Sequence, residues 1–100
     1  AQGLSGRASL PEDRAMLFVY EWDDRWPFWM RDTLIPLDIL WLRADGTVVD
    51  VQTMHPEPGV PPAQLTIYRP RAPARYVLEM NAGLAQRYGI TPGTRAHFSG

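Results

Sequence analysis

The stretch that decides the fold reads Phe28-Trp29-Met30-Arg31-Asp32-Thr33 and continues as Leu34-Ile35-Pro36-Leu37-Asp38-Ile39-Leu40-Trp41. It places three charged side chains, Arg31, Asp32 and Asp38, among large apolar ones, where an unpaired charge is costly. Each charge is therefore expected to have a partner or a function. Alternation along residues 28–33 predicts a strand in which Trp29 and Arg31 share a face, so that Arg31 could lie on the indole as a cation–π pair.

The remaining elements follow from apolar runs and turn signals. The chain has 100 residues, 45% apolar, with ten prolines and eight glycines, which is typical of one domain over residues 1–100 built from many short elements. Ala44-Asp45-Gly46-Thr47 predicts a hairpin turn, and Asn81 predicts the N-cap of a short helix over residues 82–88. Strands are expected at residues 15–20, 28–33, 37–42, 48–52, 64–68, 74–80 and 95–98. The first of these is apolar on both faces and is predicted to be central.

Composition and spacing exclude several classes of function. The net charge of −1 does not predict nucleic-acid binding. The sequence contains no run of about 18 apolar residues, so no membrane span is predicted. The absence of cysteine and lysine removes thiolate and Schiff-base chemistry. His55 and His97 lack ligand spacing, and no phosphate loop is visible, so neither a metal nor a cofactor is expected. The compartment stays open, because export after removal of a signal peptide and a cytoplasmic location both fit the sequence.

Several motifs together carry a family resemblance. They are Gly3-Leu4-Ser5-Gly6-Arg7, Ala15-Met16-Leu17-Phe18-Val19-Tyr20, Phe28-Trp29-Met30-Arg31-Asp32-Thr33-Leu34-Ile35-Pro36-Leu37-Asp38-Ile39, Ala74-Arg75-Tyr76-Val77-Leu78-Glu79-Met80-Asn81-Ala82-Gly83 and Gly89-Ile90-Thr91-Pro92-Gly93. In order and spacing they resemble domain of unknown function family 192, also called uncharacterised protein family 0127. The resemblance implies a mainly β (α+β), compact, barrel-like domain with an antiparallel or mixed sheet and one or two short helices. It implies no established reaction.

The chain also departs from the pattern of that family. The family usually has lysine at the position of Arg31, asparagine at Asp32 and methionine at Ser5. An acid at position 32 puts in doubt any role that needs a neutral amide. The family also has a strand before the Gly-Leu motif that this chain lacks, so we expect the sheet to have an open edge suited to association.

Two groups of side chains are candidates for chemistry. Trp29 and Arg31 would form an aromatic and cationic platform, with Trp22, Trp26 and Tyr68 as further members, or else would only pack the core. Asp38, Arg75 and Glu79 lie on strands that look buried, and would form a structural carboxylate–arginine pair. Alternatively, two of Asp32, Asp38 and Glu79 would serve as general acid and base in a hydrolase. Arg7, with its neighbouring glycines, is a candidate for a salt bridge with Glu79 or for binding an anion.

The hypothesis from the sequence is a small, non-enzymatic binding or accessory domain. Its ligand would be a small molecule, a carbohydrate or a peptide-like compound, bound by Trp29, Arg31, Asp32, Asp38, Arg75 and Glu79. The alternatives are a hydrolase with paired carboxylates and a structural or dimerisation module. The expected assembly is a monomer or a weak homodimer.

Overall fold

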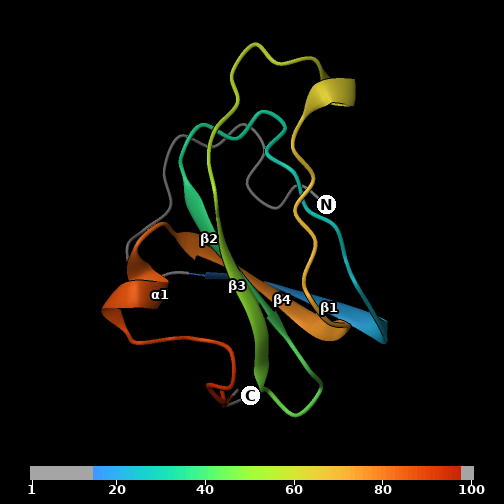
Figure 1. Cartoon of the computed structure of the whole chain (residues 1–100), viewed down its shortest axis with the longest axis vertical. Helices are drawn as coiled ribbons and strands as arrows, with labels where there is room; N and C mark the ends of the chain where they lie inside the picture. Colours follow the sequence, from blue (N-terminus) through green and yellow to red (C-terminus); the bar gives the residue numbers. More distant parts are fainter. Residues whose placement is uncertain (1–14, 98–100) are drawn as a thin grey trace.

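The computed structural model describes residues 15–97, which form a mainly β fold with one short α-helix. The four strands are β1 (Ala15–Asp24), β2 (Leu37–Leu42), β3 (Val48–Met54) and β4 (Ala74–Asn81). A 3₁₀ turn, η1 (Pro62–Gln64), interrupts the long connection between β3 and β4, and the helix α1 (Leu84–Arg87) follows β4. Figure 1 shows the strands crossing in a strongly twisted sheet, with the η1 connection reaching beyond one end.

The strands form one antiparallel sheet in the order β1-β4-β2-β3. β2 lies inside the sheet, and all six of its residues are buried. Its apolar run, interrupted only by Asp38, is typical of a strand that is covered on both faces. The described strands make an open sheet with β1 and β3 at its edges, so the closed, barrel-like form suggested by the resemblance is not seen in them.

The position of β1 corrects the prediction of a central strand. Among the described strands, β1 pairs only with β4, and its exposed and half-buried residues alternate along residues 15–20. Leu17 is 45% exposed and Val19 is 66% exposed on one face, while Phe18 packs on the core. Apolar side chains on both faces therefore did not indicate burial here, because an edge strand can leave one apolar face uncovered.

The β2–β3 hairpin confirms its turn prediction. Gly46 N–H donates to Arg43 O at 2.9 Å, and Thr47 N–H donates to Asp45 Oδ1 at 2.9 Å. Gly46 has φ +88°, and a Cβ at this position would collide with the carbonyl oxygen of Ala96. The turn thus needs glycine for both its conformation and the close approach of the C-terminal segment.

Separate segments cover the two faces of the sheet. On one face, Ile39, Trp41 and Val77 pack with Phe28 and Met30 from the connection between β1 and β2. On the other face, the core contains Leu40, Leu42, Val48, Met80, Leu84 and Ala85, of which the last two belong to α1. No helix within residues 15–97 is long and apolar enough to cross a membrane.

Three expected strands are reduced to isolated contacts. Phe28 pairs with Tyr68, and Thr47 pairs with Arg95, each as a single antiparallel bridge. Residues 28–33 are therefore not a strand, and neither are residues 64–68 or the described part of 95–98. The Gly3-Leu4 motif, together with the predicted pairing of Arg7 with Glu79, lies outside the described residues.

Candidate functional site

The charged centre of the opening motif forms a turn. Thr33 N–H donates to Met30 O at 3.5 Å, and the Thr33 hydroxyl donates to Arg31 O at 3.2 Å. Asp32 sits in the left-handed region at φ +53°, which ends the strand alternation that the sequence suggested. Met30 and Thr33 are buried at the base of the turn, whereas Arg31 and Asp32 are exposed.

A proline-rich loop faces this turn. The Glu57 carboxylate accepts hydrogen bonds from Thr66 N–H at 3.0 Å and from the Thr66 hydroxyl at 3.2 Å. Gln64 N–H donates to Pro61 O at 2.8 Å, which closes η1. Leu65 points inward and is buried. Proline restricts φ, and the Glu57–Thr66 bonds join the two arms of the loop, so this wall is held in shape before any ligand arrives.

Two hollows lie between and beside these walls. The larger, of about 450 Å³, is lined by Met30, Arg31, Asp32, Thr33, Leu34, Glu57, Pro58, Gly59, Val60, Pro62 and Leu65. The smaller, of about 260 Å³, is lined by Trp29, Arg31, Pro62, Leu65 and Ile67. Arg31 therefore borders both hollows, and no ion pair within residues 15–97 engages its guanidinium.

Of the candidate residues in this segment, Arg31 and Asp32 line the larger hollow, and Arg31 and Trp29 line the smaller one. The predicted stacking of Arg31 on Trp29 is not found. The cation–π contact seen in the described part of the chain joins Arg87 and Tyr88 instead. Both Arg31 and Trp29 instead line the smaller hollow.

The other aromatic candidates lie outside the linings of both hollows. Trp26 stacks on Tyr20 with ring centroids 4.0 Å apart and donates its indole N–H to Ala74 O at 2.9 Å. Trp22 is tilted against Trp26, and Tyr68 forms the backbone bridge to Phe28. These residues therefore do not extend the platform around Arg31.

Asp38 has a different role from the predicted pair with arginine. It is 3% exposed, and its Oδ2 accepts hydrogen bonds from Gly83 N–H and Ala85 N–H, both at 3.0 Å. Its Oδ1 accepts the hydroxyl of Thr53 at 2.8 Å. The carboxylate thus satisfies the free N–H groups at the start of α1, in place of the Asn81 cap expected from the sequence.

Arg75 pairs with neither Asp38 nor Glu79. Its Nε donates to Asp23 Oδ1 at 2.8 Å, which joins β4 to the far end of β1. Both partners are partly exposed, so this ion pair adds little to stability. The expected buried carboxylate–arginine pair is therefore wrong in its partner and in its burial.

Glu79 is the unusual carboxyl group of the sheet. It is 2% exposed, and its Oε1 has no hydrogen-bond partner among residues 15–97. Burial raises the pKa of Glu79 from its ordinary 4.5 to about 7. The buried Asp50 shows the contrast, since it accepts bonds from Val51 N–H, Gln52 Nε2 and Arg71 N–H. Glu79 therefore resists ionisation because burial separates its charged form from water, and this effect outweighs the opposing contributions.

The predicted pairing of carboxylates for hydrolysis fails for Asp38 and Glu79. In the β2–β4 register, Asp38 is opposite Met80, whereas Glu79 is opposite Ile39. Successive residues of a strand point to opposite faces, and Met80 and Ile39 belong to the two separate cores. Asp38 and Glu79 thus lie on opposite sides of the sheet and cannot act on one substrate bond. Within residues 15–97, no group of three acidic, histidine or cysteine side chains is placed to hold a metal ion.

Sequence reasoning missed the second wall of the site. Glu57, Pro62, Leu65 and Ile67 contribute to the hollows, although the sequence singled out none of them as a candidate site residue. Four prolines within residues 55–62 signalled a stiff segment, but no local pattern says that it folds back against Arg31.

Comparison with known proteins places the chain in a family. Residues 1–98 match the family model of domain of unknown function family 192, described as an uncharacterised ACR. No curated protein matches significantly.

Two solved structures share the fold with a TM-score of 0.78 each. One is a candidate transcription regulator from Sinorhizobium meliloti 1021, with 38% identity over 94% of this chain and 69% of that chain. The other is a protein of unknown function from Novosphingobium aromaticivorans DSM 12444, with 35% identity over 96% of this chain and 65% of that chain. The protein therefore belongs to domain of unknown function family 192.

Proposed function

We propose that the protein is a small, non-enzymatic binding domain that takes a peptide-like or carbohydrate ligand in the two hollows around Arg31. The observation that carries this proposal is the position of Arg31, an exposed cation that borders both hollows. The larger hollow, at about 450 Å³, has the size of an ordinary small-ligand site. Its mixed lining offers charged groups for orientation and apolar groups for contact area.

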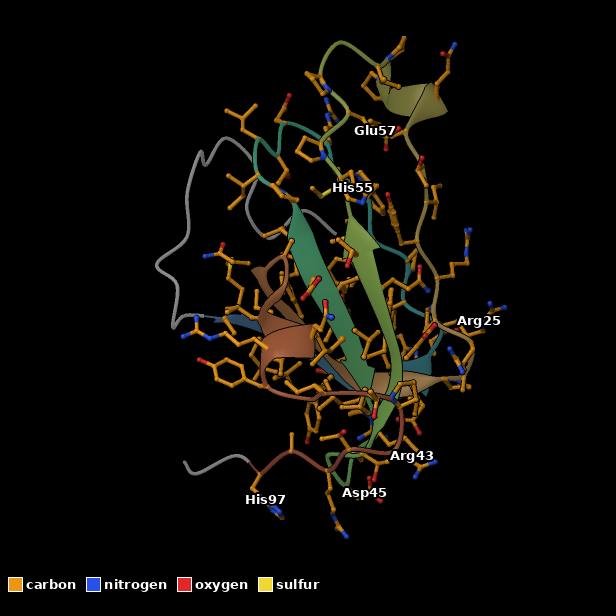
Figure 2. The ribbon with its side chains drawn as sticks, turned by 60° about the vertical axis from the view of Figure 1, so that its left-hand side comes forward. Arg25, Arg43, Asp45, His55, Glu57 and His97 are labelled. Carbon is orange, nitrogen blue, oxygen red and sulfur yellow. The ribbon has the colours of Figure 1, made fainter. Side chains whose placement is uncertain are left out.

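The position of the site in the fold supports this proposal. The hollows are formed by connections at one end of a rigid sheet, which is where binding residues are commonly carried. Figure 2 shows Glu57 at this end and Arg43 with Asp45 at the opposite end, on the β2–β3 turn. The name of the neighbour from Sinorhizobium meliloti 1021 raises DNA binding as another role, but the net charge of −1 does not favour it.

Binding to glycan and peptide arrays tests the proposal. We expect the wild-type protein to bind members of at least one array, and Arg31→Ala or Trp29→Ala to weaken that binding about tenfold or more, since each removes a wall of the smaller hollow. Arg43→Ala is the matched control, because Arg43 is also an exposed arginine but lies at the other end of the sheet. Circular dichroism would show that the variants are folded. Empty arrays, or binding that both folded variants retain, would remove the proposal.

The edge of the sheet favours dimerisation as a second candidate function. Among the described strands, β1 has a neighbour on one side only and exposes Leu17 and Val19. An unpaired, apolar edge strand is a template for pairing with a second copy. Light scattering across a range of concentrations is expected to show a dimer that Val19→Lys dissociates. A mass that stays monomeric at every concentration would exclude this role.

A further inference from the structure

The charges around the two hollows are distributed unevenly. The larger hollow has two carboxylates, Asp32 and Glu57, beside Arg31. Of the described residues, Arg31 is the one charged residue that lines the smaller hollow. A negative group is therefore repelled from the larger hollow and attracted to the smaller one. The pattern gives the combined site a direction, from an acidic end to a cationic end.

The remaining walls of the smaller hollow are apolar. Leu65 is buried at its base, Trp29 is half-buried, and Ile67 is 50% exposed at its rim. Pro62, at the start of η1, closes another side. The volume of about 260 Å³ lies below the roughly 300–1,000 Å³ of sites that enclose a whole small ligand. The hollow is thus suited to one apolar group at the end of a longer ligand.

The guanidinium of Arg31 supplies the complementary polar contact. Arginine binds a carboxylate through two parallel hydrogen bonds, and this geometry is specific to planar anions. Inside residues 15–97 no carboxylate forms an ion pair with Arg31, so this binding capacity is available to a ligand. A ligand with a carboxylate directly beside an apolar group would satisfy Arg31 and the apolar walls together.

We propose that the site binds the C-terminal end of a peptide. In this arrangement Arg31 holds the terminal carboxylate, and the last side chain, a large apolar one, lies among Trp29, Pro62 and Ile67. The preceding residues run into the larger hollow, where Asp32 and Glu57 favour a basic side chain. This inference rests on the proposed binding function and specifies its ligand.

Isothermal titration calorimetry with short synthetic peptides tests this inference. The probe is acetyl-Ala-Lys-Ala-Leu with a free C-terminal carboxylate, and its matched control is the same peptide with a C-terminal amide. We expect the acid to bind about tenfold more tightly than the amide, because the amide loses the charge-assisted bonds to Arg31. Replacing the final leucine by serine should weaken binding by a similar factor.

Protein variants separate the contributions of the two hollows. Arg31→Gln should abolish the difference between acid and amide, whereas Arg43→Gln should leave it unchanged. Asp32→Asn should reduce the preference for lysine over alanine at the second position by a few-fold, as expected for an exposed charge pair. All three charge variants lie at exposed positions, so they are expected to fold.

The outcomes distinguish this inference from the proposed function. Equal binding of acid and amide, both weakened by Arg31→Gln, would overturn the carboxylate assignment and leave the binding site in place. Failure of both peptides alongside a glycan hit that depends on Arg31 would overturn the peptide assignment alone. Failure of both peptides together with empty arrays would overturn the inference and the proposed function.

Discussion

Replacing Asp38 by alanine is expected to lower the free energy of unfolding by about 4 kcal/mol. The substitution removes the acceptor for Gly83 N–H, Ala85 N–H and the Thr53 hydroxyl at once. The Ala85 bond is buried, so its N–H would lose its protein partner. Because α1 has only four residues, it depends on this outside carboxylate for its first turn. Urea denaturation followed by circular dichroism measures the loss.

Asp38→Asn is the informative control for this prediction. The two backbone donors share a single oxygen, Oδ2, and an amide oxygen in that place can accept both bonds. The amide nitrogen would then face the hydroxyl oxygen of Thr53, which can accept in return. We expect the asparagine variant to lose only about 1 kcal/mol. Equal losses for alanine and asparagine would show that the negative charge, and not the hydrogen bonds, carries the effect.

The ionisation of Glu79 is expected to make the protein less stable as the pH rises. Its pKa is about 7 in the fold and 4.5 ordinarily, so the folded state holds its proton more tightly than the unfolded state. The stabilisation that this proton gives the folded state is then complete below about pH 4.5, declines between pH 4.5 and 7, and is lost above pH 7. The difference between the two pKa values corresponds to a change of about 3 kcal/mol in the free energy of unfolding. Denaturation curves between pH 4 and pH 8 measure it.

Glu79→Gln isolates this contribution from those of other carboxylates. Glutamine has nearly the same shape and does not ionise, so the variant should match the wild type near pH 4 and exceed its stability at pH 8. Tyr20→Phe is the control on the same face of the sheet. Burial, with a smaller contribution from the charge of Glu79, raises the pKa of Tyr20, so its phenol stays protonated throughout this range. Tyr20→Phe should therefore keep the wild-type pH dependence. A Glu79→Gln variant that is no more stable at pH 8 would contradict the assignment.

The strands that lie inside the sheet were predictable because their sequences carry strong local signals. Residues 37–42 form an apolar run that ends at an Asp-Gly turn, and this combination specifies a buried strand followed by a hairpin. Residues 28–33 gave a false strand signal. Their alternation matches the burial of Phe28 and Met30, but a turn at Arg31 and Asp32 interrupts the backbone. Burial under covering segments and burial within a sheet produce the same alternation of apolar and polar residues along the sequence.

Only one wall of the candidate site could be predicted from the sequence. The sequence drew attention to Trp29, Arg31 and Asp32, because charges beside a tryptophan in an apolar segment call for an explanation. It also grouped them with Asp38, Arg75 and Glu79, which the fold separates into a helix cap, a partly exposed ion pair and a buried acid on the opposite face from Asp38. The facing wall comes from residues about 25–35 positions later in the chain, where no local pattern points back to Arg31.

The sequence by itself determined the family, the mainly β class and the residues that need a partner, since these depend on composition, order and short-range periodicity. Only the tertiary structure decided which partner each charge has. Asp38 is 47 residues from Ala85, and Arg75 is 52 residues from Asp23. Such contacts are set by strand register and by the closure of long connections. A local pattern shows which face a side chain occupies, but not which distant group arrives there.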